Sequence, residues 1–116
     1  MSKYKNKRVE YLNYSFASHG EYECFAHLKL LEKAGEISVD KVQDNVYLTK
    51  ARIHYKPDFK CTHLKTNEPF WVEFKGFETP TWRIKRKLWL HYGPGPLEIY
   101  KKGNNGVKLT ETLTPK

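Results

Sequence analysis

The chain has 116 residues, a formal net charge of +8, and 15% aromatic residues. This length fits one domain, and the aromatic content argues against a disordered chain. Two cysteines are too few for a disulfide framework, and no apolar run is long enough for a membrane span or a secretion signal. We therefore expect a single domain over residues 1–116 that acts in the cytoplasm, away from membranes.

The positive charge is unevenly distributed. Residues 18–78 carry nine basic and ten acidic side chains, whereas residues 79–102 carry six basic and one acidic. A polyanion bound by the basic flanks and a cation bound by the acidic centre would account for both signs. A merely soluble basic protein would show the same total charge.

The N-terminal segment, residues 1 to about 14, is a basic, aromatic-rich arm that includes Lys7 and Arg8. Three alternatives stay open for it: contact with a phosphate backbone, exchange onto a partner subunit, or simple mobility.

A first helix is predicted from Ser18, a helix-capping residue, to about Ala34, with Gly35 as the left-handed cap. Glu21 has two interpretations. Ser18 and Glu21 have the spacing of a capping box, yet the glutamate also lies at the edge of the buried stripe and points toward the sheet. Glu23 faces elsewhere and is the alternative acid. The stripe itself is predicted to contain Phe25, Leu28, Leu31 and Ala34.

Three strands follow in the predicted order. The first spans residues 37–49 with an irregular middle that contains Gln43, either a solvated loop residue or a side chain that bonds the backbone or a metal-bound water. The second spans 51–60, and Pro57 removes a ladder donor just before Asp58. A turn at 66–68 leads into the third strand, which contains Phe70-Trp-Val-Glu-Phe-Lys-Gly76.

A second helix is predicted from Thr79, its cap, to about His91. No acid on it offsets the four cations within five positions, which favours phosphate contact over a solvated face. Residues 97–101 form the fourth strand, parallel to the third, and residues 104–116 are predicted to be a loose tail. The inward residues are predicted to be Trp82, Ile84, Leu88 and Trp89, and the outward ones Arg83, Lys85, Arg86 and Lys87.

Three residues on the second and third strands carry the chemistry. Side chains alternate along a strand, so Glu73 and Lys75 share one face, and Asp58 precedes them on the neighbouring strand. A divalent cation held by the two carboxylates, with the lysine beside an attacking water, would cleave a phosphodiester. A structural ion pair is the competing interpretation.

These residues resemble the PD-(D/E)xK nuclease superfamily. Ser18-His-Gly-Glu21, Tyr55-Lys-Pro-Asp-Phe59 and Val72-Glu-Phe-Lys-Gly76 are similar to the phage endonuclease I type of Holliday-junction resolvase, and other segments to small phage and prophage proteins of that superfamily. The resemblance spans roughly residues 15–102. It implies an α/β fold with a restriction-endonuclease-like core: a mixed four- to five-stranded sheet flanked by two main helices, in the order αβββαβ.

The resemblance also implies a mechanism. Asp58, Glu73 and the backbone carbonyl of Phe74 would bind Mg²⁺, with Mn²⁺ able to substitute. Glu21 would orient a second ion or the water, and Lys75 would position the nucleophile. DNA would be the partner, contacted by residues on the arm and the second helix: Lys7, Arg8, Thr79, Arg83, Lys85, Arg86 and Lys87.

The implied substrate is branched DNA, nicked by a possible homodimer because a junction presents two equivalent phosphates. The short tail and the lack of a bridging segment depart from the resolvase pattern. A sequence-specific nickase or homing-type endonuclease is the alternative enzyme, and a non-catalytic DNA-binding module the alternative of another class. The implied setting is a bacterial cell, with a phage or mobile element as the source.

Overall fold

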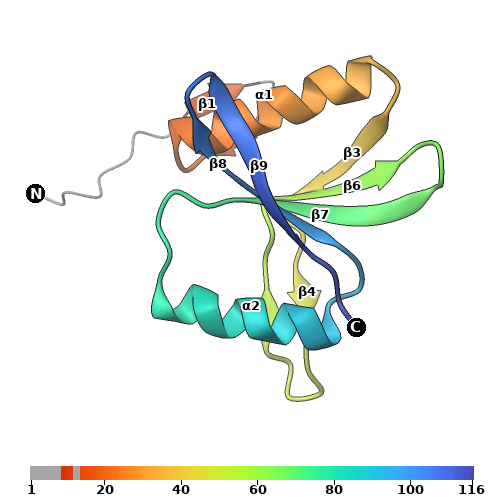
Figure 1. Ribbon diagram of the computed structural model, residues 1–116, viewed down its shortest axis with the longest axis vertical. Helices are drawn as coiled ribbons and strands as arrows, with labels where there is room; N and C mark the ends of the chain where they lie inside the picture. The colour runs from red at the N-terminus through yellow and green to blue at the C-terminus, as the bar shows by residue number, and fades with distance from the viewer. Residues whose placement is uncertain (1–8, 12–13) are drawn as a thin grey trace, which may run out of the picture.

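The structure, a computed structural model, describes residues 9–11 and 14–116, with side chains from residue 15 onward. It is a mixed α/β fold with one five-stranded sheet in the order β3-β6-β7-β8-β9 and a helix on each side of it (Figure 1). Two short strand pairs, β1–β2 and β4–β5, lie outside this sheet. The sheet is mixed, because β7 and β8 run parallel while the other neighbouring strands are antiparallel.

The first helix, α1 (His19–Lys33), begins and ends where local signals predict. The Ser18 hydroxyl accepts a hydrogen bond from the Glu21 amide at 3.2 Å, and Gly35 has a positive φ of 81° beyond the C-cap. Phe25 and Leu28 are buried, Leu31 is partly buried, and Ala34 is exposed, so the predicted stripe is correct except at its last residue.

The strands of the main sheet are β3 (Ile37–Val42), β6 (Phe59–His63), β7 (Glu68–Phe74), β8 (Leu97–Gly103) and β9 (Gly106–Leu113). The predicted first strand, 37–49, is in fact β3 and the separate β4 (Val46–Tyr47). The predicted second strand, 51–60, likewise divides into β5 (His54–Tyr55) and the start of β6. Within the described part of the chain, β4 and β5 pair with each other and with no other strand, in the register Val46 with Tyr55.

The C-terminal segment contradicts the prediction of a loose tail. Residues 106–113 form β9, an edge strand that pairs antiparallel with β8 along most of its length. Apart from Leu113, this strand carries few buried side chains. Its backbone hydrogen bonds to β8, rather than an apolar pattern of its own, hold it in the sheet.

The second helix, α2 (Pro80–Tyr92), begins as predicted with Thr79 as its N-cap, 3.0 Å from the Trp82 amide that donates to it. Trp82 and Trp89 are buried, but Ile84 is 61% exposed, so its predicted inward position is wrong. Two positions along a helix correspond to a turn of about 200°, which places Ile84 opposite Trp82.

Two hydrophobic cores cover the two faces of the sheet. One packs α1 against residues of β6, β7 and β8 that include Phe59 and Val72. The other packs the tryptophans of α2 against Trp71, Leu97 and residues of the other sheet face. The alternation along β7 therefore places Val72 on the α1 side and Trp71 on the α2 side, as a strand requires.

The short pair β1 (Val9–Tyr11) and β2 (Tyr14–Phe16) includes the end of the predicted arm. Lys7 and Arg8, predicted to contact DNA, lie outside the described residues. Neither helix in the described part of the chain combines the length and apolar character needed to cross a membrane.

Candidate functional site

Asp58 lies immediately before β6 and Glu73 lies on the adjacent strand β7, and each carboxylate accepts a hydrogen bond from the backbone beside the other. The Asp58 amide donates to Glu73 Oε1 at 3.1 Å, and the Phe74 amide donates to Asp58 Oδ2 at 2.8 Å. Both residues are buried, with exposed fractions of 8% and 7%. The register of β6 against β7 pairs Phe59 with Val72, so these reciprocal bonds follow directly from the strand alignment.

Lys75 follows β7 and completes the predicted trio. Its Nζ lies 3.2 Å from Glu73 Oε2, and the side chains of this pair are only 17% and 9% exposed. Its backbone amide donates to the Tyr100 carbonyl at 2.9 Å, which fixes the chain beyond the strand. The ammonium also lies 4.3 Å from the centre of the Trp82 ring, a cation–π contact that orients the lysine.

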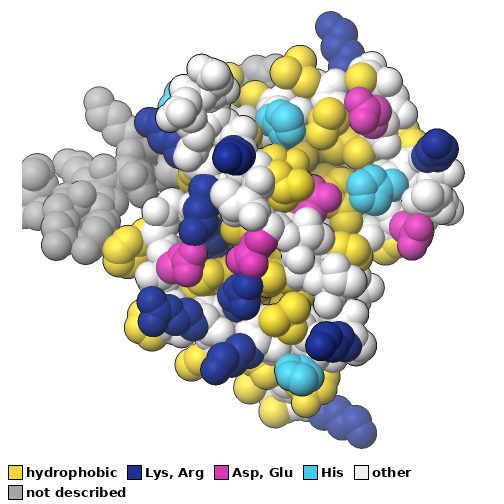
Figure 2. Space-filling model, in the orientation of Figure 1, with side chains coloured by type: hydrophobic (Ala, Val, Ile, Leu, Met, Phe, Trp, Pro, Cys, Tyr) yellow, Lys and Arg dark blue, Asp and Glu magenta, His cyan; other side chains and the backbone are white. Residues whose placement is uncertain are grey.

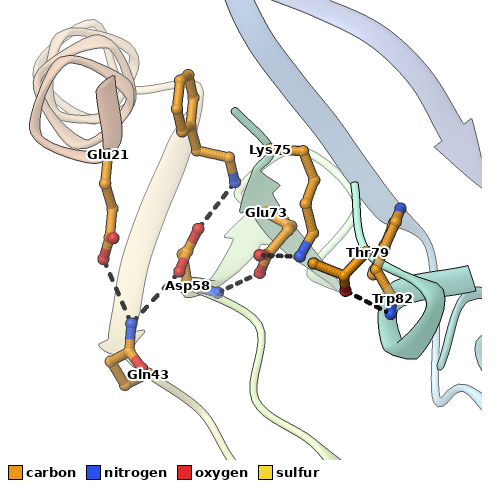
Figure 3. A network of polar contacts seen from close by, with 8 residues as sticks. Glu21, Gln43, Asp58, Glu73, Lys75, Thr79 and Trp82 are labelled. Atoms are coloured by element: carbon orange, nitrogen blue, oxygen red, sulfur yellow. Dashed lines mark hydrogen bonds and ion pairs between the residues drawn. The ribbon is translucent and has the colours of Figure 1, made fainter. Parts of the chain in front are cut away.

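Glu21 reaches this cluster through Gln43. The Gln43 Nε2 lies 3.3 Å from Glu21 Oε1 and 3.3 Å from Asp58 Oδ1, so one amide donates to two carboxylates (Figure 3). Gln43 has a φ of 62°, and its backbone N–H donates to the Asp58 backbone carbonyl at 2.8 Å. The side-chain amide of Gln43 therefore lies between the carboxylates of Glu21 and Asp58, a position that would also attract a cation.

Glu23 lies elsewhere. Its carboxylate is 2.9 Å from His19 Nε2, an i,i+4 pair on the surface of α1. Of the two candidate acids in the first turns of this helix, the structure thus brings Glu21, and not Glu23, to the cluster of Asp58 and Glu73.

Burial controls the electrostatics of the cluster. It raises the pKa of Asp58 well above its usual range, and the negative charges of Glu73 and Glu21 raise that pKa further. Burial also raises the pKa of Glu73, although Lys75 lowers it in part. Three buried carboxyl groups share a single ammonium, so the ionised site holds more negative than positive charge.

The donor chemistry of this site fits a divalent cation. No group of three or more His, Cys, Asp or Glu side chains in the described part of the chain is arranged to hold a metal ion. Asp58 and Glu73 instead offer two carboxylates, and Mg²⁺ in proteins is commonly held by one or two carboxylates with water and phosphate oxygens as its other ligands. A cation there would offset the excess negative charge.

Two site residues were not assigned a firm role by the sequence. For Gln43 the sequence leaves open a solvated loop residue or a bonding side chain, and it gives Tyr55 no role beyond the Tyr-Lys-Pro-Asp segment. Tyr55 packs against Trp82 and Trp89, with ring centres 5.5 and 6.1 Å apart, and its hydroxyl lies beside Glu73. Tyr55 lies three residues before Asp58 and two before the strand break at Pro57, and this position indicates a role for it only once the tertiary fold is known.

The basic residues of α2 have two kinds of environment. Lys85 Nζ bonds the His54 carbonyl, and Arg86 lies 2.6 Å from Glu111 of β9, so both have protein partners. Arg83 and Lys87 are exposed. Thr79 uses its hydroxyl as the helix cap. Lysine and arginine side chains gather over α2 and over part of β8 and β9 on the face that Figure 2 shows.

A cavity of about 810 Å³ lies away from these residues. It is lined by the end of α1, the β6–β7 hairpin, β8 and β9, and includes Leu31, His63 and Glu98. None of Glu21, Asp58 or Glu73 lines it. We place the candidate site at the carboxylates rather than at this cavity, because the contacts of Gln43, Lys75 and the Phe74 amide converge on Asp58 and Glu73.

The fold and the site together define a small mixed α/β protein with a buried cluster of carboxylates and one lysine where the interior strands β6 and β7 begin and end. Residues 1–102 match the family described as Protein of unknown function (DUF1064), and the chain belongs to that family. A comparison with curated proteins finds no match.

Proposed function

We propose that this protein is a metal-dependent endodeoxyribonuclease of the PD-(D/E)xK type. The observation that carries the proposal is the cluster of Asp58, Glu73 and Lys75, held where β6 begins and β7 ends by reciprocal backbone bonds and buried with too little positive charge. A protein that only binds DNA gains nothing from buried acids facing a polyanion, unless a cation lies between them. The order of helices and strands around the sheet supports the same assignment.

Each residue has a role in this proposal. Asp58 and Glu73 would hold Mg²⁺, or Mn²⁺ in its place, and the Phe74 carbonyl would be a further ligand. The cation supplies Lewis-acid catalysis and lowers the pKa of water. Lys75 would orient the attacking water and stabilise the charge that develops on the phosphate. Glu21 would act through Gln43, whose amide already connects it to Asp58.

The DNA would lie across α2. Arg83 and Lys87 are the exposed cations best placed for phosphate contact, since Lys85 and Arg86 already have partners in the protein. Contacts of this kind position a duplex without reading its sequence. We propose branched DNA as the substrate and a homodimer as the nicking form, with a sequence-specific nickase as the alternative enzyme.

Nicking of supercoiled plasmid in Mg²⁺ tests the activity. Asp58→Asn and Lys75→Met are expected to lose cleavage while retaining DNA binding in a gel-shift assay. Glu23→Gln is the matched control, because Glu23 is a nearby acid on α1 that lies outside the cluster. This variant should cut at the wild-type rate. Full cleavage by Asp58→Asn would overturn the assignment.

A second assay addresses the substrate. A four-way junction, a linear duplex and a single strand are incubated in parallel with the wild-type protein, and the products are resolved on denaturing gels. Symmetric nicks confined to the junction are expected for a resolvase, whereas nicks at one duplex sequence would indicate the site-specific alternative. Binding to all three DNAs with no metal-dependent cleavage would identify a non-catalytic DNA-binding module.

A further inference from the structure

The Tyr55 hydroxyl is a buried polar group without a hydrogen bond. Among the residues that the structure describes, it is a buried side-chain oxygen with no partner of ordinary geometry. Leaving a buried hydroxyl unpaired is unfavourable, and phenylalanine would fill the same space without that cost. A tyrosine at this position therefore needs an explanation beyond packing.

The ring of Tyr55 is fixed on several sides. It pairs through β5 with Val46, and it packs against the two tryptophans of α2. Pro57, also fully buried, follows two residues later and leads into Asp58. The hydroxyl therefore has a defined position, and the reason for its missing partner must lie in the groups around it.

Those groups are Glu73, Asp58 and Lys75. Burial is the largest cause that raises the pKa of the Tyr55 hydroxyl. The negative charge of Glu73 raises that pKa further, and Asp58 adds a smaller effect in the same direction. Both oxygens of Glu73 are already engaged, one by the Asp58 amide and the other by Lys75. The Lys75 ammonium lies 6.0 Å from the centre of the Tyr55 ring. The lysine and the tyrosine are therefore two donors that face one carboxylate, and of the two only the lysine is paired with it in this structure.

We propose that Tyr55 is the second donor for Glu73: its hydroxyl bonds the carboxylate when the Lys75 ammonium moves away to contact a DNA phosphate. The movement of Lys75 rests on the proposed function, whereas the competition between the two donors does not. Without a second donor, departure of the lysine would leave a buried carboxylate with one hydrogen bond fewer. The tyrosine keeps Glu73 oriented at that stage, which makes it a positioning residue.

A stability cycle tests the competition without DNA. Tyr55→Phe is made in the wild-type chain and in Lys75→Met, and melting temperatures are compared at neutral pH without metal. In the wild-type chain we expect no loss. In Lys75→Met, where the hydroxyl has taken the place of the lysine, Tyr55→Phe should lower Tm by roughly 5–15 °C, the effect of losing one hydrogen bond to a charged group. Equal effects in the two backgrounds would overturn the proposal.

Tyr47→Phe is the matched control. Tyr47 lies on β4, beside β5, and is 51% exposed, so its hydroxyl has no connection with Glu73. Its effect on Tm should be the same in both backgrounds. A difference as large as that of Tyr55→Phe would show that Lys75→Met weakens the β4–β5 pair in general and would contradict the specific role of Tyr55.

The catalytic half is tested on the DNA that the wild-type protein cuts. Tyr55→Phe should lower kcat roughly tenfold and leave KM near the wild-type value, because the hydroxyl acts only after Lys75 has moved. Unchanged kcat in an active wild-type background would overturn this half. If the wild-type protein cuts no DNA, the proposed function fails, while the stability cycle still decides whether Tyr55 and Lys75 compete.

Discussion

Replacing Lys75 by methionine gives the most direct measure of how much the buried cluster depends on its one ammonium. Methionine keeps much of the aliphatic length that packs near Trp82 but removes the charge. At the observed 3.2 Å from Glu73 and an effective dielectric constant of about 20, the lost attraction is about 5 kcal/mol. Lys75→Met also removes the cost of desolvating the ammonium, and the Tyr55 hydroxyl can bond Glu73 in its place. These two effects offset part of the lost attraction, so we expect the free energy of unfolding to fall by about 2–3 kcal/mol.

The assay is urea unfolding followed by far-UV circular dichroism at pH 7 without metal. With a slope of about 1.5 kcal/mol per molar urea, the midpoint should fall by about 1.3–2 M. Glu73→Gln in the Lys75→Met background should recover part of the loss, because it removes the unpaired buried carboxylate. Lys101→Met is the matched control: it breaks an exposed pair with Glu78 and should leave the midpoint unchanged within error.

A fall in midpoint as small as that of Lys101→Met would refute the reasoning. It would mean that Glu73 is protonated, or solvated, in the folded protein and does not depend on the lysine. If the midpoint does fall, the double variant Lys75→Met, Glu73→Gln shows the cause. Glu73→Gln relieves the loss if it comes from an unpaired carboxylate, but not if it comes from a packing defect.

Three further predictions follow from the same geometry. Burial raises the pKa values of Asp58 and Glu73, so above about pH 4 the folded chain binds more protons than the unfolded chain. The melting temperature without metal should therefore fall as the pH rises from about 4, and it should level off above the folded-state pKa values. Mg²⁺ should raise the melting temperature most at neutral pH, where both carboxylates are ionised most fully. Gly20→Ala should destabilise the protein by roughly 1–2 kcal/mol in urea unfolding, because the new Cβ would lie 2.3 Å from the Phe74 ring, whereas Gly76→Ala, with 3.7 Å to the same ring, should be neutral. The double variant Arg83→Ala, Lys87→Ala should weaken DNA binding and reduce its salt dependence by roughly two units of slope, and an unchanged slope would place the DNA elsewhere.

The helices were predictable because their ends are fixed by local chemistry. Ser18, Gly35 and Thr79 act within a few residues of themselves, and the structure confirms each cap. The error at Ile84 came from grouping it with the buried tryptophans by hydrophobicity alone, although its angular position on the helix is opposite to Trp82. Hydrophobic type and helical position have to agree before a residue is assigned to a core.

The strands were harder to predict where their stability depends on a neighbour. β9 has a polar, threonine-rich sequence and few buried residues, so nothing local distinguishes it from a loose segment. The division of the predicted strands around residues 43–58 depends on positive φ values at Gln43 and Arg52, which non-glycine residues adopt only when the surrounding structure imposes them.

The candidate site was predictable to the extent that it lies along one strand. Alternation places Glu73 and Lys75 on one face, and Asp58 follows from the neighbouring strand. Gln43 and Tyr55 reach the same cluster from segments outside the main sheet, and only tertiary packing brings them there. Whether this cluster binds a metal and cleaves DNA stays a prediction for the experiments above.

The contact between the Lys75 ammonium and the Trp82 ring has a practical consequence. An ammonium 4.3 Å from the ring centre alters the electric field at the indole, and indole emission responds to that field. Any ligand that draws Lys75 away from Trp82 should therefore change the emission of the unmodified protein. The molecule thus contains an optical reporter beside its candidate site, and titration with Mg²⁺ or a DNA junction can be followed without a label.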